Sequence, residues 1–376
     1  WFVERYESKP MGVGYCLFGL GFFILYGSMF FSAIGKVAAP LVDTETVTLM
    51  GTTIGIEYVL VPVIGVVVLA YGILGGLQAA YITDLIQGLC IIVLSIILIP
   101  YGLEALVEKF GDPATQGMGE GFRIMHEQLN EDHFSVVGSN NTSEFPLHRI
   151  LAVVLINLVG IVVQPHFIAT GGGSAKTEMN ARVGLVVGNF LKRFCTVGWV
   201  ITALIALALF SDRPDLVADP DRTWGVASRE LLGPGLTGLM LACLLAALMS
   251  SVDAQMIVGS GLVVRNIYAA YINPKATEQQ YLKVARMTGG LIVAGAVVVS
   301  LFMMDVFKQL QLTWVFGVLF AAPFWIGMFW RRATAKAAWA SVLFCLFAFF
   351  LVPWLGPKLV PSLRTNPELL GMTDTI

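Results

Sequence analysis

The sequence predicts an all-α, polytopic membrane protein with roughly nine transmembrane helices. The 376 residues are 57% hydrophobic and only 13% charged, whereas about half of a soluble domain is apolar and about a quarter is charged. The mean hydropathy is +0.79, and apolar runs recur that reach the length of about 20 residues needed to cross a bilayer. The 39 glycines fit this class, because glycine lets membrane helices approach closely. We expect a single transmembrane domain over residues 1–376.

Each apolar run is interpreted as one membrane-spanning helix. In chain order the predicted spans are 11–36, 53–75, 80–102, 147–169, 181–210, 235–266, 286–304, 310–330 and 336–355. Two long polar connections, about 103–146 and 211–232, are rich in Asp and other polar residues and are predicted to be solvated loops outside the membrane. Three prolines after Trp354 make a further complete span unfavourable.

Basic residues are distributed unevenly, and basic residues near span ends face the cytoplasm. With the spans assigned alternately, one set of ends carries most of them: Arg5, Lys9, Lys176, Arg182, Lys192, Arg193, Arg265, Lys275, Lys283, Arg286, Arg331, Arg332 and Lys336. Acids dominate the opposite ends, for example Asp43, Glu104, Asp112, Asp212 and Asp219. We therefore expect a cytoplasmic amino end, in a multi-pass protein of the plasma membrane, which in bacteria is the inner membrane.

Composition also excludes several classes of function. The net charge of -2 leaves no basic face for nucleic acid. The five cysteines lie in apolar runs without CxxC spacing, which favours packing roles over disulfides or a zinc site. The spans contain no HExxH or GxSxG motif and no cluster of histidines and carboxylates. We expect no enzymatic activity and no organic cofactor.

A pair of serines lies near the middle of the span predicted over 235–266. Ala247, Ser250 and Ser251 stand at i, i+3 and i+4 and so share one helix face. Carbonyl and hydroxyl oxygens are ligands that a hard cation accepts, and they carry no charge to bury. The alternative is that both hydroxyls bond to the preceding turn or join two helices. Three oxygens would form part of a cation site, and another element would have to supply the rest.

Two carboxylates fall within predicted spans. Asp253 follows the serine pair, and an intramembrane carboxylate marks an ion or proton path or lines the cytoplasmic half of a cavity. Asp84 follows Gly75 and Gly76, which are predicted to break a helix, and it shares a face with Gln87. It is either an acid favoured by the helix dipole or a group that guides a cation between the site and the cytoplasm.

Three further segments are candidates for substrate binding or gating. Pro165 beside Gln164 and the glycines at 171–173 predict a broken helix, which is how transporters build midplane sites, or a plain helix end. Lys192 either extends to the membrane surface or reaches a polar cavity. Gln311 and Trp314 either line a cavity or belong to an aromatic belt.

Three motifs, in this order, resemble the sodium:solute symporter family. They are Gly75-Gly-Leu-Gln-Ala-Ala-Tyr-Ile-Thr-Asp-Leu-Ile-Gln, Leu245-Ala-Ala-Leu-Met-Ser-Ser-Val-Asp-Ala-Gln and Phe324-Trp-Ile-Gly-Met-Phe-Trp-Arg-Arg; Gln164-Pro-His also resembles the proline symporter branch. The resemblance covers roughly residues 1–335. It implies a leucine-transporter-type fold, in which two inverted five-helix repeats alternate access around a midplane site.

The resemblance also implies residue roles. Ala247, Ser250 and Ser251 match the carbonyl and paired hydroxyls of the family's sodium site, and Asp84 matches a carboxylate near the sodium exit. Lys192 matches a lysine that contributes to substrate binding in sugar members, and Gln311 falls close to a glutamine of the tenth core helix. The unwound first core helix has no counterpart before Trp1, so we expect a chain truncated at its amino end that holds half a sodium site.

We therefore expect sodium-coupled symport of a small organic solute by alternating access, with sodium as the coupling ion and the lipid bilayer as surroundings. One alternative is proton coupling through Asp84 or Asp253, and another is a symporter-like membrane sensor. The sequence leaves the solute and the oligomeric state open.

Overall fold

The computed structural model describes residues 1–42, 46–49, 51–138, 145–168, 175–360 and 362, with the side chains at 49, 74–82 and 353 left aside. The first elements are α1 (Phe2–Tyr6), α2 (Lys9–Ala38), η1 (Ala39–Leu41), β1 (Thr46–Leu49), β2 (Thr52–Gly55), α3 (Glu57–Ile96), α4 (Leu98–Phe110), α5 (Glu120–Gln128), η2 (Glu131–Phe134), α6 (Leu147–Gly160), η3 (Ile161–Val163) and α7 (Glu178–Phe210). The others are α8 (Pro214–Ala218), η5 (Pro220–Arg222), α9 (Thr223–Leu231), α10 (Pro234–Val263), η6 (Val264–Ile272), α11 (Glu278–Phe302), α12 (Val306–Gly317), α13 (Ala321–Phe329), α14 (Ala335–Leu346), η7 (Phe347–Leu351) and α15 (Val352–Leu359).

The apolar helices of the described chain confirm a polytopic helical membrane protein. Six of them are long and apolar enough to cross a bilayer: Lys9–Leu41, Thr83–Phe110, Glu178–Phe210, Pro234–Ile272, Glu278–Phe302 and Val306–Phe329. Three shorter apolar helices cover Glu57–Ile73, Leu147–Val163 and Ala335–Leu351. Each predicted span overlaps one of these helices, because an apolar run in a membrane must satisfy its backbone hydrogen bonds within itself.

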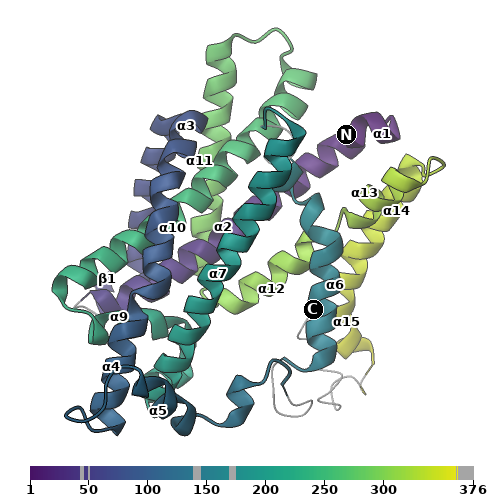
Figure 1. Ribbon diagram of the computed structural model, residues 1–376. Coiled ribbons are helices and arrows are strands. Elements are labelled where there is room, and N and C mark those ends of the chain that lie inside the picture. The colour runs from purple at the N-terminus through teal and green to yellow at the C-terminus, as the bar shows by residue number, and fades with distance from the viewer. Residues whose placement is uncertain (43–45, 50, 139–144, 169–174, 361, 363–376) are drawn as a thin grey trace.

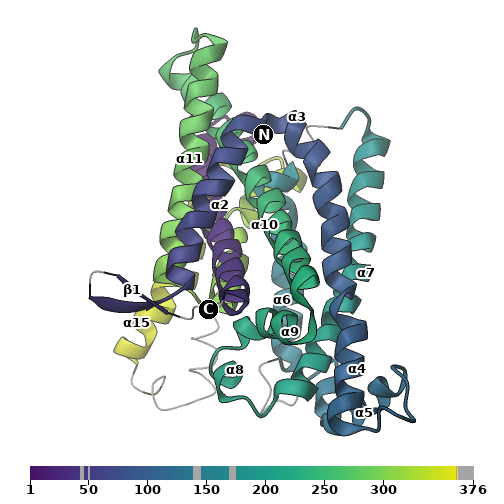
Figure 2. The ribbon, with the colours of Figure 1, turned by 90° about the vertical axis from the view of Figure 1, so that its left-hand side faces the viewer.

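Helix α10 packs against α2, α3 and α11 (Figures 1 and 2). The packed layer between these four helices includes Phe31, Val61, Val252, Met256 and Val293, all nearly or fully buried. Asp253, Gln255 and Ser260 of α10 are buried, so these polar side chains face other helices. Ser250 and Ser251, predicted to bind a cation, are partly buried on the same helix.

A close approach between α3 and α7 shapes the side of the bundle next to α10. A Cβ atom at Gly198 of α7 would lie only 2.3 Å from the backbone oxygen of Ser95, so this crossing requires a glycine. The neighbouring Trp199 donates its indole N–H to Ser95 Oγ at 2.7 Å. This contact fixes the rotation of α7, the helix that carries Lys192.

The two ends of the molecule match the predicted division of charge. Helix α1, the η6–α11 hairpin and the connection between α13 and α14, which carry residues of the basic set, lie at one end (Figure 1). The elements α4, α5, α8 and α9 lie at the opposite end (Figure 2). We refer to the first as the basic end, which the distribution of Lys and Arg predicts to be cytoplasmic.

Several predicted boundaries are wrong. Residues 53–55 do not begin a span but form β2, which pairs antiparallel with β1 around Gly51 at a φ of +84°, so the chain is not purely helical. Gly75 and Gly76 lie within α3, whose helical backbone continues through them, but the chain turns back at the basic end (Figure 2), so its two arms form two separate apolar helices as predicted. The span predicted over 310–330 coincides with the apolar segment Val306–Phe329, but its helix is interrupted between α12 and α13.

The two polar connections are also more ordered than predicted. The connection at 103–146 contains the end of α4 and helix α5, whose Ile124 and Met125 pack against Leu106. In the connection at 211–232, Asp219 forms an ion pair with Lys36 at the end of α2. The carboxylate of Asp221 accepts the backbone N–H of Val306 at 3.1 Å, and burial raises the pKa of Asp221. These contacts attach the connection to the ends of α2 and α12.

Candidate functional site

The serine pair and Ala247 form a compact group of oxygens on α10. Ser250 Oγ donates to the Ala247 carbonyl oxygen at 3.0 Å, and Ser251 Oγ donates to the same oxygen at 3.2 Å. Both serines are partly buried. The hydroxyls thus bond to the preceding turn, as one of the two interpretations expects. The same geometry holds three uncharged oxygens together, with hydroxyl lone pairs free to turn toward a cation.

This group lies at a cavity of about 590 Å³ between α2, α3, α7 and α10. Ala247 and Ser251 line it from α10, and Lys192 and Trp199 line it from α7. Tyr26 contributes from α2. The structure therefore brings Lys192 into one cavity with two members of the oxygen group, although 55 or more residues separate them in sequence. The cavity combines mostly apolar walls with a few polar groups, as small-molecule sites do.

Asp253 is buried deeply on α10, with 2% of its surface exposed. A Cβ atom at Gly72 of α3 would lie 2.9 Å from Asp253 Oδ1, so the absence of a side chain there makes room for the carboxylate. Within the described part of the chain, Oδ1 has no hydrogen-bond partner. Asp84 of α3 is partly buried, and its carboxylate interacts electrostatically with that of Asp253. The structure thus places both predicted ion-path residues in the same region.

The predicted helix break at Gln164 is present. Helix α6 ends at Gly160, η3 ends at Val163, and Gln164 has extended backbone angles. The hydroxyl of Tyr15 donates to the carbonyl oxygen of Val163 at 2.7 Å, which satisfies one group released by the break. The glycines at 171–173 lie outside the described residues.

The side chain of Gln164 points to a second break. Its Nε2 would be 3.3 Å from a Cβ atom at Gly317, the last residue of α12. The chain leaves α12 here and begins α13 at Ala321. Gln164 therefore lies where two interrupted helices meet, a position that suits a gating residue.

Gln311 and Trp314 are partly exposed on α12, and neither lines the cavity that contains Lys192. The glutamine enclosed by the protein is instead Gln309, which is 2% exposed. Its Nε2 donates to Ser32 Oγ at 2.7 Å and to the Met303 carbonyl oxygen, and its Oε1 accepts from Ser28 Oγ at 3.1 Å. Sequence reasoning missed this network, although Ser28 and Ser32 have the i, i+4 spacing of one helix face.

We expect Gln309→Leu to destabilise the protein, because the three hydrogen bonds of its buried amide would be lost, although Ser28 and Ser32 keep partners in Leu25 and Ser300. Each hydrogen bond of this kind contributes about 0.5–1.5 kcal/mol. The matched variant Gln311→Leu, two residues away on a partly exposed face, should change stability by less. Thermal unfolding of the two purified variants compares them directly, and equal melting temperatures would contradict a special role for Gln309.

The apolar helices define an integral multi-pass membrane protein. The family model of the sodium:solute symporter family matches residues 25–344. The chain belongs to the sodium:solute symporter family, which confirms the resemblance drawn from the three motifs.

The chain is also similar to individual members of this family. It is 27% identical to a sodium/proline symporter of Haemophilus influenzae, over 73% of this chain and 53% of the relative. It is likewise 27% identical to a sodium/pantothenate symporter of the same organism, over 86% of this chain and 64% of the relative. It is also 27% identical to a sodium/myo-inositol cotransporter 2 of Oryctolagus cuniculus, over 74% of this chain and 45% of the relative. The chain thus spans about half to two thirds of the length of these bacterial relatives.

A solved structure supports the fold independently. It is described as the substrate-bound outward-open state of a Na⁺-coupled sialic acid symporter, and it superposes with a TM-score of 0.66 over 89% of this chain and 66% of the other. The sequence identity is 15%, so this likeness concerns the fold.

Proposed function

We propose that the protein takes part in sodium-coupled symport of a small organic solute by alternating access. The observation that carries this proposal is the convergence of Ser250 Oγ and Ser251 Oγ on the Ala247 carbonyl oxygen. Ala247 and Ser251 of this group also line the cavity that contains Lys192. The family, whose members matched here are transporters, supports the same function. We place the protein in the plasma membrane, the inner membrane in a bacterium, with residues 1–376 acting as one transmembrane unit.

In this proposal sodium binds to the oxygens of Ala247, Ser250 and Ser251, and further ligands come from another element. A hard cation suits a site built from uncharged oxygens, and neutral ligands avoid the cost of a permanent buried charge. Asp84 and Asp253 lie along the path between this site and the predicted cytoplasmic end. Sodium binding and solute binding would strengthen each other by linkage.

Lys192 is the proposed contact for the solute. Its ammonium group supplies three hydrogen-bond donors, which suit a carboxylate or hydroxyl group. We assign gating roles to Gln164, Gln311 and Trp314, because Gln164 lies where two helices are interrupted and the other two lie on α12, which ends at that point.

The alternative of proton coupling rests on the buried carboxylate of Asp253, whose Oδ1 has no hydrogen-bond partner among the described residues. The relatives are named as sodium symporters and so do not favour it. Uptake of labelled candidate solutes into proteoliposomes separates the two. We expect accumulation that follows an imposed sodium gradient and stops when choline replaces sodium. Accumulation that persists in choline and follows a pH gradient would contradict sodium coupling.

A further inference from the structure

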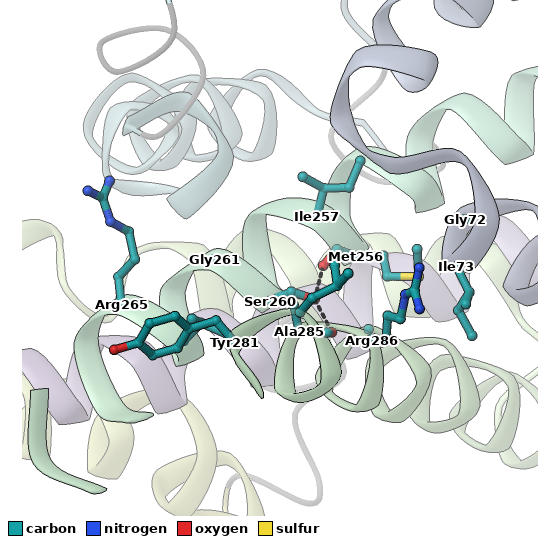
Figure 3. Close-up of a pocket in the computed structure, with 13 residues that line it drawn as sticks. Gly72, Ile73, Met256, Ile257, Ser260, Gly261, Arg265, Tyr281, Ala285 and Arg286 are labelled. Carbon is teal, nitrogen blue, oxygen red and sulfur yellow. Dashed lines mark hydrogen bonds between the residues drawn. The ribbon is translucent and has the colours of Figure 1, made fainter. Parts of the chain in front are cut away.

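A second cavity, of about 360 Å³, lies near the basic end and away from the serine pair. Its walls come from three helices and the segment that follows one of them: α3, α10, η6 and α11. Most of the lining is apolar, for example Ile73, Met256, Ile257 and Leu282 (Figure 3). Leu282 is 51% exposed, so the cavity opens to the outside of the bundle. Such walls fit a hydrocarbon chain better than a polar solute.

The hydrogen-bonding groups of this lining are largely satisfied within the protein. The hydroxyl of Ser260 donates to the carbonyl oxygens of Met256 and Ala285, at 2.6 and 2.8 Å (Figure 3). The hydroxyl of Tyr281 faces the carbonyl oxygens of Asn273 and Pro274, at 3.4 and 3.3 Å. Neither hydroxyl therefore needs a ligand.

Two guanidinium groups of the lining differ from these hydroxyls. Arg265 and Arg286 are exposed, and in the described part of the chain neither forms a hydrogen bond or an ion pair. They lie on either side of the contact between Ser260 and Ala285 (Figure 3). Arginine matches the geometry of phosphate oxygens, so two free guanidiniums beside an apolar cavity are complementary to a ligand that is anionic at one end.

The position of the cavity agrees with a membrane surface. Arg265 lies in η6, close to the end of the apolar helix Pro234–Ile272, and Arg286 lies about two turns into the next one, Glu278–Phe302. Lys275 and Lys283 add positive charge to the same hairpin. Basic pockets between helices on the cytoplasmic side attract anionic lipid head groups.

We propose that this cavity binds an anionic phospholipid, with its head group at the mouth of the cavity, which Arg265 and Arg286 flank, and part of an acyl chain along the walls of α3, α10 and α11. One lipid satisfies both halves of the site, because it joins a phosphate to a hydrocarbon chain. A free anion would leave the apolar cavity empty, and in phosphatidylcholine the choline ammonium balances the phosphate, so its attraction to the two arginines is weaker than that of an anionic lipid. The bound lipid would hold α11 and α3 against α10, the helix of the serine pair.

Native mass spectrometry of the purified chain tests the charged half of the site. The protein is titrated with phosphatidylglycerol, cardiolipin and phosphatidylcholine in a neutral detergent. We expect tighter binding of the two anionic lipids, by about fivefold for each guanidinium. The variant Arg265→Gln plus Arg286→Gln should lose one bound anionic lipid. The control Arg331→Gln plus Arg332→Gln removes two exposed charges from the basic end outside the cavity and should keep it.

A second variant tests the apolar half without changing any charge. A Cβ atom at Gly261 meets no atom within 4 Å, so Gly261→Leu should fill the cavity without strain on the helix. The matched control is Gly238→Leu, which also meets no atom within 4 Å but lies outside the cavity on the same helix. We expect only Gly261→Leu to lose one bound lipid. Equal binding of phosphatidylcholine, displacement of the lipid by inorganic phosphate, or unchanged binding by both cavity variants would overturn the proposal.

Discussion

Replacing both hydroxyls, as Ser250→Ala plus Ser251→Ala, should reduce sodium-driven solute uptake to background. The double variant removes two of the three oxygens that converge at Ala247. A hydrogen bond to a charged group contributes about 1.5–3 kcal/mol, so each lost ligand should weaken sodium binding by about tenfold or more. The measurement is uptake as a function of sodium concentration in proteoliposomes that contain equal amounts of protein.

Two controls separate loss of a ligand from loss of structure. Ser251→Thr keeps a hydroxyl at the same position and should retain sodium-dependent uptake. Ser260→Ala removes another hydroxyl that bonds back to its own helix, but outside the oxygen group, and should retain it as well. Undiminished uptake by the double alanine variant would contradict the assignment of the sodium site.

The second large effect is expected for Asp253→Asn. This substitution should raise the sodium concentration that uptake requires but also raise the melting temperature. Asp253 stands three residues after Ser250, so their Cβ atoms are about 5–6 Å apart on a helix. Loss of a negative charge at that distance should raise the sodium concentration for half-maximal uptake by about tenfold or more. The same change removes the charge of a buried carboxylate whose Oδ1 has no hydrogen-bond partner among the described residues, which should raise the melting temperature.

Asp84→Asn is the matched comparison, because Asp84 is only partly buried and its substitution should stabilise the protein less. For both variants, uptake as a function of sodium concentration measures the change in sodium dependence, and thermal unfolding measures the change in melting temperature. An Asp253→Asn variant with wild-type sodium dependence would remove Asp253 from the ion path. Uptake that loses its dependence on external pH while sodium dependence persists would instead assign it to proton transfer.

The long helices of this fold were predictable because length and hydropathy identify membrane spans in a sequence. The same criterion cannot find short amphipathic helices such as α5, which packs Ile124 and Met125 onto α4 only after the chain folds back.

The candidate site was predictable only where the spacing lay within one helix. Ala247, Ser250 and Ser251 share a face by their i, i+3 and i+4 positions, and the structure places their oxygens together. Gln311 and Gln309 illustrate the opposite case. They differ by about 200° around α12, so the choice between them depends on which face α12 turns toward α2. That rotation is set by tertiary contacts with Ser28 and Ser32, which local spacing does not contain.

Binding of radioactive sodium to the purified protein tests the central claim most directly, because it needs no knowledge of the solute. We expect saturable binding that unlabelled sodium displaces and choline does not. The variant Ser250→Ala plus Ser251→Ala should lose it, while Ser260→Ala should keep it. Saturable sodium binding that is unchanged in the double variant would contradict the claim that Ala247, Ser250 and Ser251 form the sodium site.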